Sequence, residues 1–315
     1  PEVMVEDFDA ARVGFDAAER FVPDAMMLPG VAAPGLVPGY PANVGISRPA
    51  LHKVLGDRAL ADGATVRLGV TAERLDDDGD AVTVHFSDGT SARHDLVIGA
   101  DGIYSQTRAM ILPDAETPQF TGQSVWRYNF PRPAGLDALQ VFNGPTGVGL
   151  VPVSADLMYM FVTTPEPGNP RYPQEGLAAA MRGKLARCAP FIRDLAEQIS
   201  DDDAVVYRPL EGMLVNGPWH KGRVALLGGA VHATTPHLGQ GAGMAVEDSL
   251  VLAEELDRHD SIDAALTAYR DRRFDRCAYI VNASLAICKG QLGEGPPVDN
   301  HQATAEMFAV VSQPI

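Results

Sequence analysis

Cysteine, positive charge and long apolar runs are all scarce in this sequence. Its 315 residues hold three cysteines, and 25 Lys and Arg face 41 Asp and Glu, a formal net charge of −16. Three widely spaced cysteines favour reduced thiols in a cytoplasmic protein over a disulfide scaffold. Because affinity for nucleic acid comes mostly from Lys and Arg, this acidic balance argues against such a partner. No apolar run approaches the roughly 20 residues of a membrane helix, so we expect no membrane partner.

What the sequence does contain is typical of a globular protein, with 46% hydrophobic and 21% charged residues. The length allows two domains, or one large domain with a smaller lobe. The chain starts at Pro1 rather than Met, within a segment whose pattern over residues 2–20 predicts a polar helix.

Two apolar segments, residues 95–100 and 224–228, are typical of strands buried on both faces of a parallel sheet. Before them, Ser47 is a plausible N-cap for a helix ending at residue 61, and residues 64–70 and 81–87 predict a meander of short strands around the turn at Asp77 to Gly79. Between them, strands are predicted at 124–130, 147–153, 157–163 and 204–213, and helices at 175–187 and 192–199.

This order of segments predicts an α/β (α+β) fold, a mixed parallel-sheet domain with an inserted antiparallel-sheet domain. The expected division is residues 1–118 with 217–260 for the first domain, 119–216 for the insertion, and 261–315 for a C-terminal helical segment. The helical pattern of that segment covers residues 262–289, and little pattern follows.

The first candidate motif runs from Asp95 to Arg108. Asp101 and Gly102 end the first apolar strand, which places a carboxylate at the edge where open α/β sheets bind ligands. Gly102 permits close backbone approach, and Ser105 and Arg108 can face phosphate or ribose. The alternative is a simple Asp-Gly turn with Arg108 in a surface ion pair.

The second candidate motif runs from Gly222 to Asp248. Its strand leads into a loop with Gly239, Gly241 and Gly243, which opens onto a helix N-terminus able to receive negative charge. The alternative is a connection that binds nothing, but three glycines in five residues cost conformational entropy without an evident structural return.

Together with Ile46 to His52 and Gln123 to Tyr128, these motifs resemble the class A flavoprotein monooxygenases, the family of para-hydroxybenzoate and salicylate hydroxylases, over residues 41–276. The resemblance implies an FAD-binding domain with an inserted substrate domain, NAD(P)H as reductant, and transfer of oxygen from O2 to a small aromatic or phenol-like substrate. The implied cofactor contacts are Arg48, Asp101, Gly102, Arg108, Gly228, Gly229, Pro236, Gly239, Gly241, Ala242, Gly243 and Met244.

The substrate side is expected to come from the inserted domain and from the glycine-rich loop. The candidates for catalytic roles are His237, Tyr207, Arg208, Arg127 and Tyr159. For each of them the structural alternative is core packing or an ordinary ion pair. No pair of His or Cys residues has the spacing of metal ligands, and no metal is predicted.

Two features depart from the family pattern. The sequence has no Gly-x-Gly-x-x-Gly turn, so the chain is expected to be either a fragment or a protein that never had this site, with another chain or a homo-oligomer as a source of the missing unit.

Gly229 stands where the family has an Asp that accepts a flavin ribityl hydrogen bond, worth about 1.5–3 kcal/mol. Glu247 and Asp248 are expected to cap or solvate the next helix. The alternative function is a flavin-free cyclase, isomerase or small-molecule binding protein.

Overall fold

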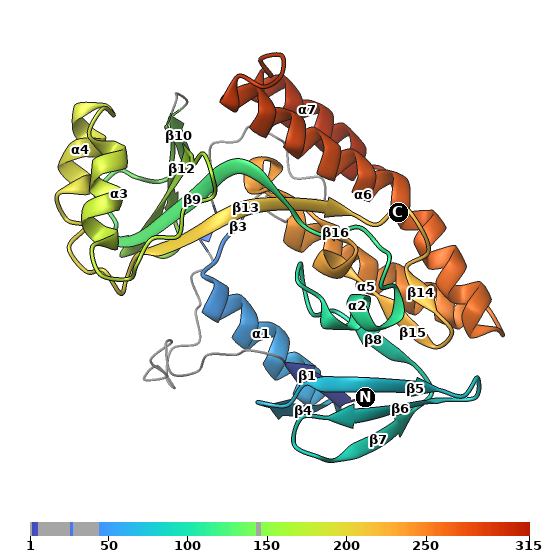
Figure 1. The fold of residues 1–315 in the computed structure, drawn as a ribbon. Helices are drawn as coiled ribbons and strands as arrows, with labels where there is room; N and C mark the ends of the chain where they lie inside the picture. Colours follow the sequence, from blue (N-terminus) through green and yellow to red (C-terminus); the bar gives the residue numbers. More distant parts are fainter. Residues whose placement is uncertain (1, 6–25, 28–43, 143–145) are drawn as a thin grey trace. The chain divides into compact units, whose positions relative to one another are not determined.

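The computed structural model describes residues 2–5, 26–27, 44–142 and 146–315. The chain divides into two compact units (Figure 1). Unit 1 comprises Pro1–Val13, Ala64–Thr121 and Glu211–Ile315, and unit 2 comprises Gly14–Gly63 and Gly122–Leu210. This division differs from the predicted one at both ends of the chain, since residues 261–315 group with unit 1 and residues 14–63 with unit 2.

The two apolar segments of the sequence pair in unit 1 as parallel strands. β8 (Val97–Gly99) lies beside β15 (Val224–Leu226) with Val97 opposite Val224, and β14 (His220–Lys221) pairs with β15 in the antiparallel sense. The parallel pairing is confirmed, but the expectation that both strands are buried on both faces is wrong for β8. Ile98 is 45% exposed, whereas all three residues of β15, the middle strand of this sheet as the described residues form it, are buried.

The first residues of the chain form a strand. β1 (Glu2–Val5) pairs in parallel with β4 (Thr65–Leu68), so the predicted helix over residues 2–20 is wrong at residues 2–5, and its remainder falls outside the described residues. The meander therefore consists of β5 (Ala72–Asp77), β6 (Val82–Phe86) and β7 (Ser91–His94), without β4. Val82, Val84 and Phe86 alternate into the core, as the period of a strand requires.

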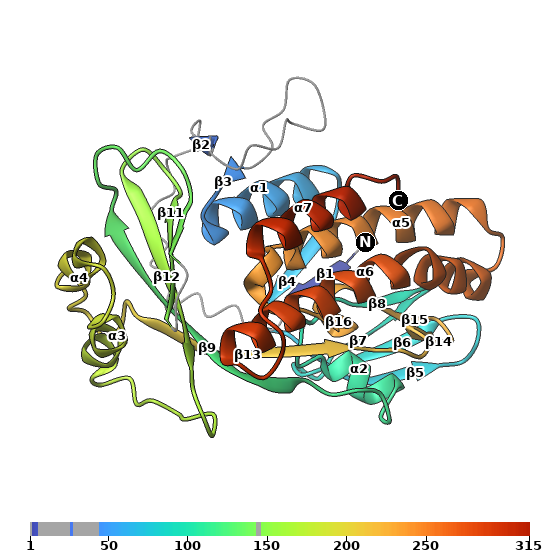
Figure 2. The same cartoon turned by 90° about the horizontal axis from the view of Figure 1, so that it is seen from above.

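Helices complete unit 1. They are α2 (Gln106–Ile111), the short 3₁₀ turns η1 (Gly228–Ala230) and η2 (Pro236–Leu238) on either side of β16 (His232–Ala233), α5 (Gly241–Arg258), α6 (Ile262–Leu292) and α7 (Asn300–Val311). Figures 1 and 2 show α7 lying beside α6. The sequence pattern does not predict α7, because Met307 is the one residue that it buries. Asp299 caps α7 by accepting from the amides of His301 and Gln302.

Unit 2 contains α1 (Arg48–Ala61), where the predicted cap is confirmed: Ser47 Oγ accepts from the amide of Ala50 at 3.3 Å. A six-stranded sheet has the order β10, β11, β12, β9, β13, β16, of which β16 and one end each of β9 and β13 belong to unit 1. The bounds of its strands are β9 (Gln119–Pro131), β10 (Gln140–Phe142), β11 (Gly147–Pro152), β12 (Leu157–Pro165) and β13 (Val206–Leu214), and β2 (Met26–Met27) pairs separately with β3 (Val44–Gly45).

Two short helices, α3 (Leu177–Leu185) and α4 (Pro190–Ala196), pack on one face of this sheet (Figure 2). Together they bury Trp126, Met158 and Met160 completely. Arg127 and Phe161, which face each other across β9 and β12, belong to the opposite face. None of the described helices is long and apolar enough to cross a membrane.

Candidate active site

The carboxylate of Asp101 is used by the helix that follows it. Its Oδ1 accepts from Ser105 Oγ at 2.5 Å and its Oδ2 accepts from the amide of Thr107 at 2.9 Å. Ser105 in turn caps α2 by accepting from the amide of Arg108. Gly102 has φ +78°, a conformation that only glycine adopts without strain. The Asp-Gly motif is therefore a fixed turn that presents backbone at the end of β8.

Arg108 lies differently from the expectation that it faces phosphate or ribose. Its side chain is 6% exposed, and its guanidinium donates to the carbonyls of Ala230 at 2.8 Å and Ile103 at 3.0 Å. Burial lowers the pKa of this guanidinium. Arg108 therefore connects the turn after β8 with the η1 turn after β15. Because its guanidinium is used in this way, a phosphate at this edge of the sheet would be bound by backbone groups.

Gly229 is where these two turns meet. A Cβ placed on Gly229 would lie 3.3 Å from the Cα of Gly102 and 3.3 Å from the amide nitrogen of Ile103. These are backbone atoms, which cannot rotate away as the end of a side chain can. The position that carries Asp in the family therefore has little room here for any side chain.

The glycine-rich loop leaves the N-terminus of α5 open. Gln240 makes no side-chain cap, the first turn contains no acidic residue, and the amides of Gly241, Ala242 and Gly243 find no acceptor in the part of the chain that the structure describes. Gly239 has φ +67°, and a Cβ there would meet nothing within 4 Å. Unpaired amides at the positive end of an 18-residue helix suit an anionic group. Met244, by contrast, is buried below this turn.

His237 lies on η2, just before this loop. Its Nδ1 is 2.9 Å from Thr235 Oγ1 and its Nε2 is 3.2 Å from Gln291 Oε1 on α6. Burial lowers the pKa of His237, so its imidazole is neutral near pH 7. Both ring nitrogens have partners, and His237 joins the loop to α6.

Asp248 overturns the expectation that it caps or solvates α5, because its side chain is fully buried. Its Oδ2 accepts from the amide of Gly228 at 2.9 Å and lies 2.5 Å from His232 Nε2, while its Oδ1 accepts from Arg273 Nε at 2.8 Å. Arg273 is buried as well and pairs with Glu247 at 2.6 Å. This network fixes the start of η1 from beneath.

The donor atoms of His232, Asp248 and Cys277 lie within 4.8 Å of one another, a grouping that can hold a metal ion. Arg273 occupies the same cluster, with its Nη2 3.6 Å from Cys277 Sγ. A guanidinium already supplies the positive charge there, which favours an ion-pair network over a metal site. The only signal in the sequence for this network is the Arg-rich pattern of α6, and that pattern does not show that Asp248 is the partner of Arg273.

Arg127 and Tyr159 come together in unit 2. Both are half-buried, on the adjacent strands β9 and β12. Burial lowers the pKa of Arg127, and the positive charges of Arg48 and Arg208 lower it further. Burial also raises the pKa of the Tyr159 phenol. No carboxylate among the described residues pairs with Arg127, and the like charges of Arg48 and Arg208 lie near it, so the charge of Arg127 suits an anionic group.

Tyr207 is not part of this arginine group. Its hydroxyl lies 3.0 Å from Ser124 Oγ and donates to the carbonyl of Pro170, and its ring packs against Trp126 and Tyr172. Core packing, the alternative to a catalytic role, therefore describes Tyr207 and Trp126 well, since both belong to the aromatic core under α3 and α4. Arg208 is exposed and donates to the carbonyl of Tyr207.

Comparison with known proteins places these motifs in a family. Residues 36–284 match the family described as an FAD binding domain. YetM of Bacillus subtilis, named as an FAD-dependent monooxygenase, is 29% identical over 95% of this chain and 77% of its own length. An FAD-dependent urate hydroxylase of Klebsiella pneumoniae is 33% identical over 71% of this chain, a match that spans 59% of that enzyme.

Solved structures agree. The crystal structure of Klebsiella pneumoniae HpxO complexed with FAD and uric acid superposes with a TM-score of 0.74 at 29% identity, covering 85% of this chain and 72% of HpxO. The residues of unit 1 fit the flavin end of such a cofactor, because the open α5 amides and the side-chain-free loop at Gly239 leave donors and space for an anionic ring. The chain belongs to the FAD-binding family of class A flavoprotein monooxygenases.

Proposed function

We propose that this protein binds FAD and uses NAD(P)H and O2 to hydroxylate a small aromatic or heteroaromatic molecule. In the overall reaction, NAD(P)H supplies two electrons, one oxygen atom of O2 enters a ring C–H bond as hydroxyl, and the other leaves as water. The observation that carries the proposal is the open N-terminus of α5 behind the Gly239 to Gly243 loop, in a chain of this family.

Within unit 1, three backbone segments would hold the cofactor. The amides of Gly241 to Gly243 would receive negative charge from the flavin ring, and the turns at Gly102 and Gly229 would offer backbone without side chains. When bound, FAD accepts hydride from NAD(P)H and supplies the oxygen-transfer chemistry. The protein's own part is to fix these turns, through Arg108 and Asp248, and to exclude water.

In unit 2, the charge of Arg127, which pairs with no carboxylate of the described residues, would hold an anionic group of a ligand, and both dinucleotides carry phosphates. An Arg127→Gln variant should raise KM for NAD(P)H or the Kd for FAD at least about tenfold. An Arg187→Gln variant is a matched control, since Arg187 lies in an exposed turn of the same unit.

The absorption spectrum tests the proposal most directly. Purified protein titrated with FAD should give a stoichiometric yellow complex that NAD(P)H bleaches and O2 restores. A colourless protein that cannot be reconstituted would defeat the proposal for this chain. The flavin-free alternative would then gain, since Gly229 lacks the family's carboxylate and has little room for one. A native mass measurement in the same preparation shows whether a second chain takes part.

A further inference from the structure

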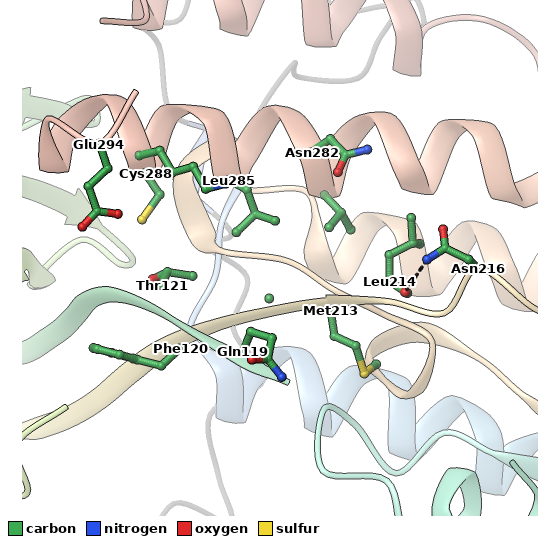
Figure 3. A pocket seen from close by; sticks show the side chains of 13 residues that line it. Gln119, Phe120, Thr121, Met213, Leu214, Asn216, Asn282, Leu285, Cys288 and Glu294 are labelled. Atoms are coloured by element: carbon green, nitrogen blue, oxygen red, sulfur yellow. Dashed lines mark hydrogen bonds between the residues drawn. The ribbon is translucent and has the colours of Figure 1, made fainter. Parts of the chain in front are cut away.

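The long helix α6 contacts two parts of unit 1 through its two halves. In its C-terminal half, Leu285 and Cys288 point toward the strands β9 and β13 and line a cavity of about 420 Å³ (Figure 3). The residues that line this cavity belong to β9, β13, α6 and the loops that follow β13 and α6. The N-terminal half of α6 instead pairs with carboxylates of α5, through Arg272, Arg273 and Arg276. This charged half is therefore the part of α6 that acts on the helix at the flavin end of the site.

The first turn of α5 needs support from elsewhere in the fold. Gly241 and Gly243 stand in this turn, and glycine within a helix is destabilising relative to alanine. Gln240 gives the turn no side-chain cap. Because neither residue type nor capping stabilises the turn that offers unpaired amides to a ligand, a tertiary contact has to do so.

Arg273 supplies that contact. Its side chain is completely buried, and its Nη2 donates to the carbonyl of Met244, in the first turn of α5, at 3.4 Å. Its Nε donates to Asp248 Oδ1 at 2.8 Å, and Asp248 Oδ2 accepts from the amide of Gly228 in η1. A Cβ on Gly228 would lie 3.1 Å from the Cβ of Ala245, so η1 packs directly against α5. One guanidinium therefore stabilises both the helix turn and the η1 turn.

Glu247 is a second carboxylate beside Arg273. A buried guanidinium is costly without paired charge, and Glu247 Oε2 lies 2.6 Å from Arg273 Nη1. The other oxygen of Glu247 accepts from Arg276 Nη1 at 2.9 Å. Arg276 also donates from its Nη2 to the carbonyls of Gln313 at 2.6 Å and Pro314 at 3.1 Å. The contacts thus run from the residues after α7 through Glu247 and Arg273 to the two turns.

We propose that Glu247 is a positioning residue of the flavin site. It fixes the side chain of Arg273, and through Arg273 it keeps the first turn of α5 and the η1 turn in place before the cofactor binds. Its ion pairs are with arginines of α6, so its effect on FAD passes through Arg273. This inference rests on the proposed function. It assigns a part in cofactor binding to a residue that the sequence pattern predicts only to cap or solvate its helix.

Hydrogen–deuterium exchange of the FAD-free full chain, measured at single amides by mass spectrometry, reports on the two turns directly. The amides of Gly228 and Met244 are both hydrogen-bonded in the wild type. In Glu247→Gln both should exchange at least about tenfold faster, because the local opening of the two turns becomes easier.

Glu255→Gln is the matched control. Glu255 belongs to the same helix, its side chain is 4% exposed, and it pairs with Arg272 of α6. It lies about two turns further along α5, so exchange at Gly228 and Met244 should stay within about twofold of the wild type.

Titration with FAD, followed by flavin fluorescence, connects the turns with the cofactor. Glu247→Gln should raise the Kd for FAD at least about tenfold, and Glu255→Gln should leave it within about twofold. Circular dichroism verifies that each variant is folded during the titration. Arg276→Gln is a milder second variant, which removes the outer partner of Glu247 at a side chain that is 10% exposed. It should raise the exchange rates and the Kd at least about threefold, and it replaces Glu247→Gln if that variant does not fold.

Faster exchange at both amides with weaker FAD binding, and with Glu255→Gln unchanged, supports the proposal. Unchanged exchange at either amide, or an increase of similar size in Glu255→Gln, overturns it and makes Glu247 an ordinary ion-pair partner of α6. Faster exchange with an unchanged Kd overturns the connection with the cofactor. A wild type that takes up no FAD defeats the proposed function, while the exchange rates still decide whether Glu247 stabilises the two turns.

Discussion

The backbone of Gly229 lies against the backbone of Gly102, so closely that a Cβ on Gly229 would be 3.3 Å from the Gly102 Cα. The first glycine follows β15 and the second follows β8, and the two strands pair in parallel. The turns after neighbouring parallel strands meet at the carboxyl edge of the sheet, where open α/β folds bind ligands. Two glycines at this contact leave that edge as bare backbone.

Two substitutions of Gly229 separate the steric cost of a side chain at this position from the gain of a carboxylate that accepts a hydrogen bond from FAD. Gly229→Ala should lower stability, since the turn must shift by a few tenths of an ångström, and should weaken FAD binding. Gly229→Asp carries the same steric cost but adds a carboxylate acceptor, and should bind FAD about 10- to 100-fold more tightly than Gly229→Ala. FAD titration of both variants measures the ratio. Equal affinity for the two would show that no ribityl hydroxyl reaches this position.

Removing the charge of Asp248 should destabilise the protein severely. Asp248→Asn removes the fully buried carboxylate that pairs with Arg273 and His232 and leaves Arg273 with Glu247 alone, a loss of about 3–5 kcal/mol of unfolding free energy. Asp257→Asn on the exposed side of the same helix should change it by less than about 0.5 kcal/mol. Urea unfolding of both variants measures the difference. Similar values for the two would mean that the Asp248 network contributes no more than a surface charge.

The same network predicts a pH dependence. Burial by itself lowers the pKa of His232, but the hydrogen bonds with Asp248 and Cys277 outweigh it and raise the pKa from 6.5 to about 10. A pKa raised in the folded state adds stability that is fully present below pH 6.5 and is lost as the pH rises through about 10.

His232→Gln is the variant that tests this dependence, because Gln keeps an N–H donor for Asp248 without a titrating charge. We expect the unfolding free energy of the wild type to fall between pH 6.5 and pH 10 more steeply than that of His232→Gln. Urea unfolding at a series of pH values gives both slopes. Parallel slopes would show that His232 is neutral in the folded protein.

In unit 2, Gly149 is covered by the ring of Phe161. A Cβ on Gly149 would lie 2.0 Å from the Phe161 ring across the β11–β12 pair, so the ring must move in Gly149→Ala. We expect a loss of about 1–3 kcal/mol of unfolding free energy. Phe161→Leu in the same chain should recover part of it, because the shorter side chain leaves room for the methyl group. Additive effects of the two substitutions would contradict this contact.

The sequence predicted the structure correctly where the interaction that decides it joins residues close together in the chain. Ser47 caps α1 as predicted, because a side chain at that position reaches the amide of a residue three places on. The apolar segments at Val97 and Val224 are strands, as continuous apolar runs of this length predict, but the burial on both faces that such runs favour holds for β15 and not for β8. The prediction failed at residues 2–5, where pairing with β4 determines a strand that the local polar pattern does not show.

Asp248 shows why the rest could not be predicted. A carboxylate on an amphipathic helix is usually solvated, and nothing in its neighbourhood along the chain marks it as buried. Its partners are Gly228, His232 and Arg273, which lie on three different elements, and only their packing removes water from the group. Arg108 is similar, since the carbonyl of Ala230 that holds it belongs to a distant turn.

The family, the two apolar strands and the glycine-rich loop before α5 could be read from the residues alone, because each depends on residue type and spacing within one segment. The contact of Gly229 with Gly102 and the internal positions of Arg108 and Asp248 come from tertiary packing. These depend on distances between segments far apart in the chain, which the packing of helices against sheets determines.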